Sequence, residues 1–361
     1  MINPTRELLS TRFNRQAGSA VHLSRTQRMI TSTVSGKLIN GDYRLLANPC
    51  PCGKAGKDLL ISEIDRYGLP LDTVLCSICG TLRIDPYPDD AALSDFYTHH
   101  YQQMYARAND RVAYFEKQRS YGQSILGSIR DWLPIGAYVF EIGCGGGGAL
   151  DVMQHQGYRV GGCDYSPELI EYGRSRGLPL HCGPPLDVLK ALPTPSLILM
   201  HHVFEHVRDP LDMLRGLQKL TPRAKLLIVV PDVSRIGEFP FPAGDLRLFI
   251  HIAHRFNFSL EGLRLLATAA GYEVEDLQQY QAHLSPEFRA LLTPKPELKS
   301  TSMDPHAGQR MLAYLRRTER LRRVFLTRGQ ILGLPARLRG KLSRMFGRAG
   351  RASVSTPSHM C

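Results

Sequence analysis

Long apolar runs are what this sequence of 361 residues most clearly lacks. No stretch approaches the roughly 18 apolar residues of a membrane-spanning helix, and the first residues contain no apolar segment of the kind that a secretory signal needs. Internal repeats are also absent, and the length allows two domains of ordinary size. Because the reducing cytosol suits a chain with eight cysteines, we expect a cytoplasmic protein.

Acidic residues are nearly absent from the end of the chain. From Arg310 onward there are 13 Lys or Arg and one acid, Glu319, which accounts for the whole net charge of +12 and leaves the rest balanced at 32 against 32. Apolar side chains recur at helical spacing within this tail, at Leu338, Leu342, Met345 and Phe346. Such a basic amphipathic helix is typical of an interfacial segment, so an anionic membrane surface is a candidate partner. Nucleic acid attracts the same charge, but stacking aromatics are missing here, and a solvated tail is the third interpretation.

A glycine cluster directly after an apolar run is the most informative feature of the middle of the chain. Residues 137–147 read AYVFEIGCGGG, a pattern that predicts a buried strand followed by a sharp turn. Residues 149–156 then predict a helix, so the loop would deliver a ligand to a helix N-terminus. A strand, a glycine loop and a helix in this order form the first part of a nucleotide-binding site in doubly wound α/β sheets. The loop also fits the dinucleotide fingerprint G-x-G-x-x-G, at Gly143, Gly145 and Gly148.

The residues that follow decide between these interpretations. Residues 158–163 predict a second strand that ends at Asp164, which lies 21 positions after Gly143. A carboxylate there suits a ribose diol, because one ionised acceptor can take both hydroxyl protons. Residues 196–200 and 225–230 predict two further strands, and the first of them runs into the sequence HHVFEHVRDP at 201–210.

Together these motifs resemble the class I, Rossmann-like, S-adenosylmethionine-dependent methyltransferases. The E-x-G-C-G-x-G loop resembles their cofactor motif, and the E-H-x-x-D-P element that begins at Glu205 recurs in their small-molecule branch. Residues 226–231, 254–259 and Gly271-Tyr272 look like the same branch. The resemblance covers roughly residues 120–280. It implies an α/β fold with a doubly wound, mostly parallel sheet, and S-adenosyl-L-methionine as the cofactor.

The resemblance also implies a set of cofactor-binding residues: Glu141, Gly143, Gly145, Gly147, Asp164, Tyr165 and His201. The glycines and the acid before them would line the methionine end of the cofactor, Asp164 would hold the ribose, and Tyr165 would lie near the adenine. The family often has an acid after the third strand that binds the adenine amine. Here residues 181–185 read HCGPP and Asp187 comes late, so the adenine contact stays open.

Methyl transfer needs alignment of the reacting atoms, exclusion of water and often removal of one proton. His206 is a candidate general base because an imidazole titrates near neutrality, and we group His202 and Glu205 with it as catalytic candidates. His254 is a further candidate. The alternative is that His206 and Glu205 only start a helix and order the loop. Ubiquinone-type O-methyltransferases can hold a divalent ion with E-x-x-E-H, but His202 replaces the first acid here, which argues against a catalytic metal.

Four of the cysteines fall in two tight pairs, Cys50-Pro-Cys52 and Cys76-Ser-Ile-Cys79, each followed by glycine and separated by 23 residues. Four thiolates suit a tetrahedral structural zinc ion, which would order a segment too short to build its own core. A redox pair or unligated thiols are the alternative. A similar zinc-ribbon-like segment precedes the catalytic domain in some bacterial methyltransferases of sugar and cell-surface glycan pathways. In those proteins the segment is followed by an F-Y-x-x-x-Y stretch, which FYTHHY at 96–101 resembles.

The expected organisation has five parts: a loosely ordered segment 1–45 with short helices, a zinc-ribbon-like segment 46–90, a helical connector 91–133, a methyltransferase domain 134–290 and a basic tail 291–361. The family's sheet ends in an antiparallel hairpin. Residues 273–279 fit its first strand, but prolines at 286, 294 and 296 interrupt the second. We therefore expect methyl transfer to a small-molecule or glycan acceptor, at oxygen first. The alternatives are a non-catalytic binding protein with this fold and an NAD-dependent oxidoreductase.

Overall fold

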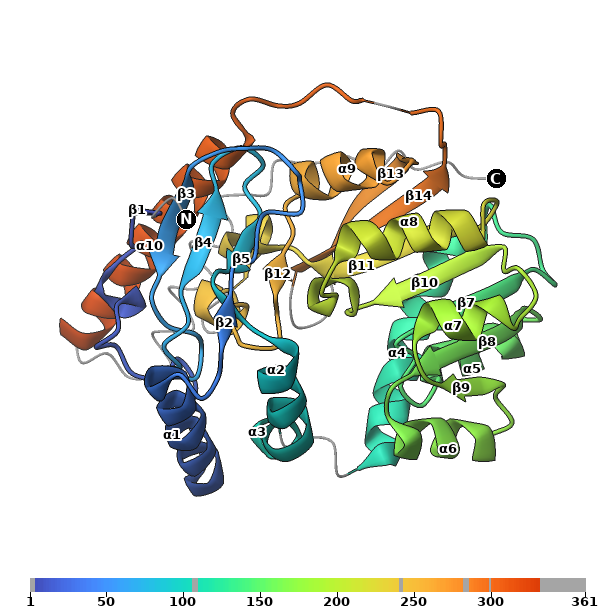
Figure 1. Cartoon of the computed structure of the whole chain (residues 1–361), viewed down its shortest axis with the longest axis horizontal. Coiled ribbons are helices and arrows are strands. Elements are labelled where there is room, and N and C mark those ends of the chain that lie inside the picture. The colour runs from blue at the N-terminus through green and yellow to red at the C-terminus, as the bar shows by residue number, and fades with distance from the viewer. Residues whose placement is uncertain (1–3, 106–109, 240–242, 282–285, 299, 332–361) are drawn as a thin grey trace, which may run out of the picture.

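The computed structural model describes residues 4–105, 110–239, 243–281, 286–298 and 300–331. Two lobes lie side by side in Figure 1, an N-terminal lobe with a small sheet and a larger lobe around a seven-stranded sheet. None of the described helices combines the length and the apolar character that a membrane span requires.

The seven-stranded sheet has the order β13-β14-β11-β10-β7-β8-β9. Its parallel strands are β7 (Tyr138–Ile142), β8 (Arg159–Asp164), β9 (Leu180–Cys182), β10 (Leu197–His201) and β11 (Lys225–Pro231). The strand order reverses at β7 and β10, so the loops after these strands open at a topological switch point, where open α/β sheets bind ligands. The predicted doubly wound, mostly parallel α/β fold is confirmed.

Helices cover both faces of this sheet. On one face α4 (Arg111–Ile129), α5 (Gly148–His155) and α6 (Pro167–Ser175) pack over a core that includes Phe115 and Ile129. On the other face α7 (Pro185–Lys190), α8 (Pro210–Leu220) and α9 (Leu260–Ala269) pack over a core that includes Leu214 and Leu266. With both faces covered, the central strands β7, β10 and β11 are buried almost end to end, as their apolar sequences predict.

The sheet ends in a complete antiparallel hairpin, although the sequence predicted that its second strand would be interrupted. β13 (Tyr272–Gln281) pairs with β14 (Pro286–Pro294), which inserts between β13 and β11. The prediction that prolines interrupt this strand was wrong, because Pro286 and Pro294 are its first and last residues, and the ladder between them is continuous. Proline lacks an amide hydrogen and is tolerated at the ends of a strand.

The N-terminal lobe contains a five-stranded sheet of order β1-β3-β4-β5-β12. Four of its strands come from the N-terminal part of the chain: β1 (Thr5–Arg6), β3 (Asp58–Ser62), β4 (Thr73–Cys76) and β5 (Leu82–Ile84). The fifth, β12 (Phe256–Asn257), comes from the methyltransferase part and pairs antiparallel with β5. A separate two-stranded ribbon joins β2 (Leu45–Leu46) and β6 (Tyr87–Pro88).

Residues 4–45 are more ordered than the composition indicates. The helix α1 (Arg25–Asn40) has a capping box between Ser24 and Gln27 and ends at Gly41, whose φ is 83°. Its apolar residues Ile30, Val34 and Leu38 are buried in the core of the lobe. The spacing i, i+4, i+8 is helical, but with so many polar residues between them the three apolar positions do not stand out in the sequence.

The connector that follows the small sheet is helical. α2 (Asp90–Phe96), a π-helical turn over Tyr97–Tyr101 and α3 (Gln102–Met104) lead towards α4.

The C-terminal helix α10 (Ala307–Ile331) packs on the N-terminal lobe rather than on the methyltransferase sheet, next to β1 and β3 in Figure 1. Met311 and Leu315 are buried in the same core as Phe13 and Leu75. The predicted basic tail 291–361 therefore begins within β14, and its residues 307–331 form a structural helix. The amphipathic pattern at 338–346 lies outside the described residues.

Candidate functional site

The glycine loop after β7 requires glycine for two physical reasons. Gly143 and Gly145 have φ of 71° and 53°, which side-chain-bearing residues rarely adopt. A Cβ on Gly143 would come within 2.3 Å of Val203, and one on Gly145 within 2.7 Å of the Gln118 amide nitrogen. The loop is therefore held between the turn after β10 and the helix α4. The helix α5 begins at Gly148, one residue before its predicted start at 149.

Gln118 on α4 fixes the shape of this loop. Its Nε2 donates to the carbonyl oxygen of Cys144 over 2.8 Å, and its Oε1 accepts from the amides of Gly146 and Gly148 over 3.2 and 3.4 Å. The side chain is buried, with 8% of the residue exposed. The sequence analysis missed Gln118, because no motif marks a lone glutamine on a mixed-character helix.

Two carboxylates flank the loop. Asp164, at the end of β8, accepts from the amide of Gly145 through Oδ2 and from the amide of Ser166 through Oδ1, both over 2.9 Å. Glu141, near the end of β7, is 3% exposed, and its Oε2 has no hydrogen-bond partner among the described residues. Burial, and then the nearby Asp164, raise the pKa of Glu141 well above its usual value. A cationic ligand that donates to this oxygen would offset the cost of burying the acid.

A second group of charged residues lies after β10. His202 has a left-handed φ of 53°, and its ring lies between two carboxylates, with Nδ1 3.3 Å from Glu205 Oε1 and Nε2 3.3 Å from Glu287 Oε2. Burial opposes the charge on His202, but these two hydrogen bonds overcome it and raise its pKa to about 9. Its neighbour His201, whose ring lies 4.7 Å from that of Tyr121, has a pKa lowered to about 3, chiefly by burial.

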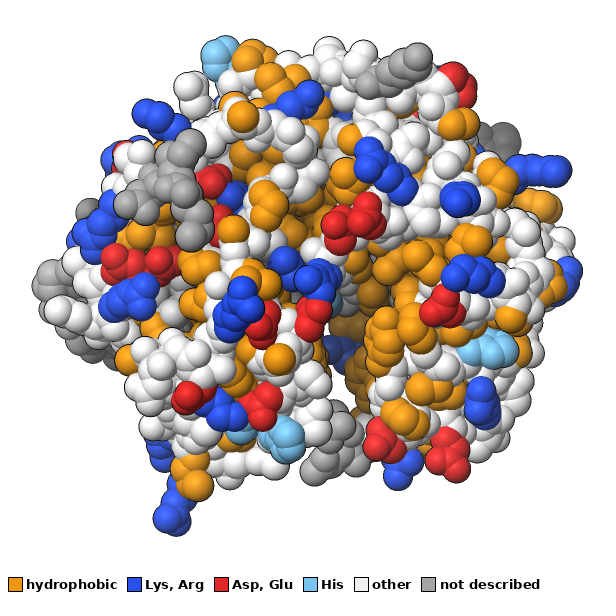
Figure 2. Space-filling model, in the orientation of Figure 1, with side chains coloured by type: hydrophobic (Ala, Val, Ile, Leu, Met, Phe, Trp, Pro, Cys, Tyr) orange, Lys and Arg blue, Asp and Glu red, His pale blue; other side chains and the backbone are white. Residues whose placement is uncertain are grey.

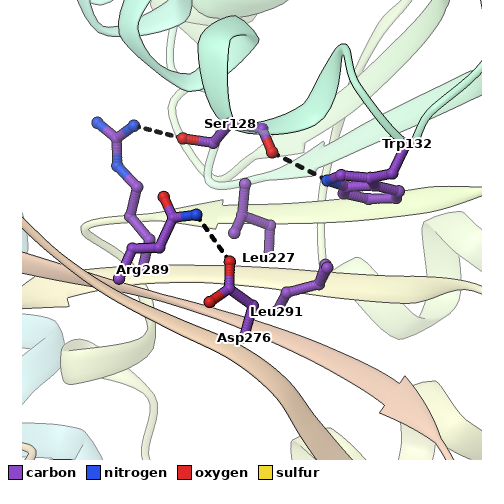
Figure 3. Close-up of a pocket in the computed structure, with 7 residues that line it drawn as sticks. Ser128, Trp132, Leu227, Asp276, Arg289 and Leu291 are labelled. Carbon is purple, nitrogen blue, oxygen red and sulfur yellow. Dashed lines mark hydrogen bonds between the residues drawn. The ribbon is translucent and has the colours of Figure 1, made fainter. Parts of the chain in front are cut away.

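Glu287 and Arg289 on β14 extend this group towards α4. Arg289 donates to Glu287 Oε1 over 2.8 Å and to the hydroxyls of Ser124 and Ser128, also over 2.8 Å each. Both residues were missed in the sequence, since β14 was not predicted as a strand. A small pocket beside Arg289, lined also by Trp132, Leu227 and Asp276, lies between α4 and the sheet (Figure 3). None of the predicted site residues lines it.

His206 and His254 form a third group with Glu205. The Nδ1 of His206 donates to the carbonyl oxygen of Ala253 over 2.5 Å, which leaves its Nε2 with a free lone pair. The ring of His254 lies 4.9 Å from that of His206 and 3.7 Å from that of His251. Burial is also the main reason why the pKa of His254 is lowered well below its usual value.

An aromatic wall, made of Tyr67, Tyr101, Tyr105 and His251, continues from this group into the N-terminal lobe. The Tyr105 hydroxyl lies 2.8 Å from His251 Nδ1, and the rings of Tyr101 and Tyr105 lie 4.5 Å apart. Burial raises the pKa of Tyr101, and the charges of Asp164 and Glu205 add to that rise, so this ring lies near both parts of the site. Figure 2 shows a hollow between the two lobes, towards which β10 points in Figure 1.

The four predicted metal-ligating cysteines come together in the N-terminal lobe. Their sulfur atoms lie within 4.8 Å of one another, with 3.5 Å between Cys50 and Cys79 and 4.0 Å between Cys52 and Cys76. A tetrahedral zinc thiolate site, with Zn–S of about 2.3 Å, separates its sulfurs by about 3.8 Å. The donor set and its spacing therefore fit zinc.

The structure thus groups the predicted residues into a glycine-loop part, a histidine and carboxylate part and a separate cysteine cluster. Tyr165 stands apart from these groups, because 70% of it is exposed. Its contact with the adenine stays a prediction.

The fold and the loop together define an α/β protein of the class that binds a nucleoside-type cofactor at the carboxyl edge of its sheet. A family model described as a methyltransferase domain matches residues 97–277, which is half of the chain. The chain belongs to this family of methyltransferases. The strand order, with one antiparallel strand inserted beside β11, is that of its Rossmann-like class.

No curated protein matches the chain. Solved structures that resemble it include a TehB-like S-adenosylmethionine-dependent methyltransferase from Corynebacterium glutamicum, at 19% identity over 57% of this chain and 100% of that one, with a TM-score of 0.35. Another is the magnesium protoporphyrin IX methyltransferase from Synechocystis with bound S-adenosylhomocysteine, at 15% identity over 57% and 100%, with a TM-score of 0.40. A third is the mitomycin 7-O-methyltransferase, at 18% identity over 56% and 60%, with a TM-score of 0.40.

Proposed function

We propose that this protein transfers a methyl group from S-adenosylmethionine to a hydroxyl group of a small molecule or a glycan. The observation that carries the choice of cofactor is the pair of carboxylates beside the glycine loop. Glu141 offers a buried oxygen without a partner among the described residues, which suits the ammonium group of the methionine part. Asp164 retains lone pairs for the ribose hydroxyls beside its two backbone contacts.

The same carboxylates argue against an NAD-dependent oxidoreductase. A dinucleotide would bring a negatively charged pyrophosphate close to Asp164 and would leave the buried Oε2 of Glu141 without a partner. S-adenosylmethionine instead carries an ammonium group that can pair with Glu141, and this pairing would favour the ionised form of the acid, which burial alone disfavours.

The residues of the chain have three tasks in this proposal, while the cofactor supplies an electrophilic methyl group. The glycine loop and Gln118 fix the position of the donor. The aromatic wall excludes water and holds the acceptor, whose hydroxyl must lie in line with the methyl group. The third task, removal of the hydroxyl proton, falls to the group of Glu205, His206 and His254, in which His206 Nε2 offers a free lone pair.

His202 has a positioning role in this scheme rather than that of a base. With a pKa near 9 it is protonated at neutral pH, and both its ring nitrogens are directed at carboxylates. It holds Glu205 in place and balances the charge of Glu205 and Glu287.

The test is a calorimetric titration of the purified protein with S-adenosylhomocysteine, with NAD as the comparison. We expect binding of the former alone, weakened at least about tenfold in Asp164→Ala, because hydrogen bonds to a charged group contribute roughly 1.5–3 kcal/mol. Asp131→Ala is the matched control, since Asp131 is exposed beyond the end of α4 and faces Arg130.

Two other outcomes would contradict the proposal. Binding of NAD in place of S-adenosylhomocysteine would establish the oxidoreductase alternative. Binding of neither, by a folded protein with its full metal content, would favour a non-catalytic protein that keeps the fold.

Two further proposals concern other parts of the chain. We propose that Cys50, Cys52, Cys76 and Cys79 hold a structural zinc ion, which the distances between their sulfur atoms support. We also propose that the basic residues beyond α10 attach the protein to an anionic membrane surface, on the support of their charge and spacing in the sequence.

A further inference from the structure

Glu205, His206 and His254 each direct a potential ligand atom towards the same point. These atoms lie within 4.8 Å of one another, although the residues come from two separate segments, the single turn η3 (Phe204–His206) and the loop that leads to β12. Two imidazoles and one carboxylate are a ligand set that divalent first-row transition metals favour.

Two of the three residues carry a buried polar atom without a hydrogen-bond partner among the described residues. Glu205 is 1% exposed, yet its Oε2 has no hydrogen bond among the described residues, and the same holds for the buried Nδ1 of His254. Buried polar atoms are nearly always paired, so each such exception requires an explanation, and an ion is one that serves both atoms at once.

The atoms behind the ligands are also arranged as in metal sites. Metal-ligating histidines usually donate their other ring N–H to a carbonyl or a carboxylate, which fixes the tautomer. His206 does this through Nδ1, which donates to Ala253 over 2.5 Å and leaves Nε2 free. The remaining oxygen of Glu205, Oε1, is held by His202 Nδ1 at 3.3 Å. A ligating carboxylate is likewise held by a neighbouring hydrogen bond.

The neighbouring group of His201, His202 and Glu287 is equally compact but does not need an ion. Both nitrogens of His202 already face carboxylates, and Glu287 Oε1 accepts from Arg289 over 2.8 Å. No polar side-chain atom of this group is both buried and unpaired among the described residues, whereas Glu205 and His254 in the neighbouring group each have one. The group of Glu205, His206 and His254 is therefore the better candidate for a metal site.

The sequence argued against a metal because His202 replaces the first acid of E-x-x-E-H, but His254 brings a third ligand from a distant segment. We propose that Glu205, His206 and His254 form a binding site for a divalent first-row transition metal ion, with open coordination positions for a water molecule or an acceptor oxygen. Binding of the ion does not depend on the proposed function, but the role of the ion rests on it. The lone pair of His206 would then coordinate the ion, and the ion would hold the acceptor oxygen that the imidazole otherwise contacts. The site is distinct from the cysteine cluster, whose soft thiolates select zinc.

The test uses Mn²⁺, because thiolates bind it poorly and its free-ion paramagnetic resonance signal disappears on binding. The full-length protein is dialysed against a chelator, its zinc content is checked, and Mn²⁺ is then titrated. We expect saturable binding in the unmodified protein and in His155→Gln, which removes an exposed histidine on α5. Glu205→Gln and His254→Gln should each weaken binding at least about tenfold.

Thermal melting of each variant guards against a trivial loss through unfolding, and added Mn²⁺ should raise the melting temperature of the unmodified protein but not of the two site variants. Equal Mn²⁺ binding by all variants, or none by the unmodified protein, overturns the proposal. A parallel titration with S-adenosylhomocysteine separates the metal site from the proposed function. If the protein binds S-adenosylhomocysteine but does not bind Mn²⁺, the proposed function stands and only the metal site is refuted.

Discussion

At the scale of single residues, neighbours in the sequence acquire opposite properties from their surroundings. His201 and His202 are adjacent at the end of β10, but burial lowers the pKa of the first to about 3, and two carboxylates raise that of the second to about 9. The sequence marks both as candidates for a site. It does not tell them apart, because Glu287, which lies 85 positions away from His202, decides the difference.

Gln118 provides a test of the glycine loop at this scale. Gln118→Leu keeps the approximate shape of the side chain but removes its hydrogen bonds to Cys144, Gly146 and Gly148. Because buried groups left unpaired cost about 1–3 kcal/mol, we expect roughly tenfold weaker binding of S-adenosylhomocysteine in calorimetry.

Gln123→Leu is the control, since Gln123 is exposed on the same helix. Unchanged cofactor affinity in Gln118→Leu, with a normal melting temperature, would show that the loop holds its shape without the glutamine.

At the scale of elements, the local patterns of the sequence predict strands and loops well where the signal is continuous. The run before the glycines, Asp164 at the end of the next strand and the paired cysteines all lie where short-range patterns place them. Two features that the sequence does not reveal, the strand β14 and the role of Gln118, depend on contacts between distant segments. The strand β14, with proline at both ends, is specified by its pairing with β11 and β13, and Gln118 is specified by the loop that packs against it.

The helix α10 is another element whose role comes from distant contacts. Glu319, the single acid of the basic end of the chain, accepts from the Ser10 hydroxyl over 2.7 Å and pairs with Arg12 over 3.1 Å. The amide of Gly308 donates to the carbonyl oxygen of Ile78 beside the cysteine cluster. A deletion that tests the tail must therefore keep this helix.

We expect a chain that ends at Ile331 to fold normally but to lose binding to anionic vesicles. The residues beyond Ile331 include six Lys or Arg and no acid, and each basic residue near such a surface contributes roughly 1 kcal/mol. Vesicle sedimentation at low and high salt measures the effect, with neutral vesicles as the control.

A shorter chain that ends at Gln309 should instead lose stability, because it lacks Met311, Leu315 and Glu319. Equal vesicle binding by the full chain and the chain that ends at Ile331 would refute a membrane role for the tail.

At the scale of the whole molecule, the cysteine cluster and the methyltransferase part share structure. β12 completes the small sheet by pairing with β5, and the Ser259 hydroxyl donates to the carbonyl oxygen of Cys79 over 2.5 Å. Leu265 on α9 packs against the cysteines themselves. The N-terminal lobe is thus joined to the catalytic part by a strand, a hydrogen bond and a helix face.

Loss of zinc should therefore weaken the whole chain and not one lobe alone. We expect Cys52→Ser to purify with less zinc and to melt at a lower temperature in a single transition, as followed by circular dichroism and metal analysis. Zinc thiolate sites contribute directly to folding free energy, which is the reason for the expected loss.

Cys182→Ser is the matched control, because Cys182 is the exposed cysteine among those described. Far less than one zinc ion per unmodified chain, or equal melting of both variants, would count against a structural zinc site.

The position of α10 has a consequence for how the protein is made. The N-terminal lobe holds β1 and Phe13 from the beginning of the chain and Met311 and Leu315 from near its end. Domains synthesised on the ribosome usually fold in order from the N-terminus. Here the N-terminal lobe cannot close until α10 has emerged, so the methyltransferase sheet, which lies between the two in the sequence, can assemble before the lobe that precedes it.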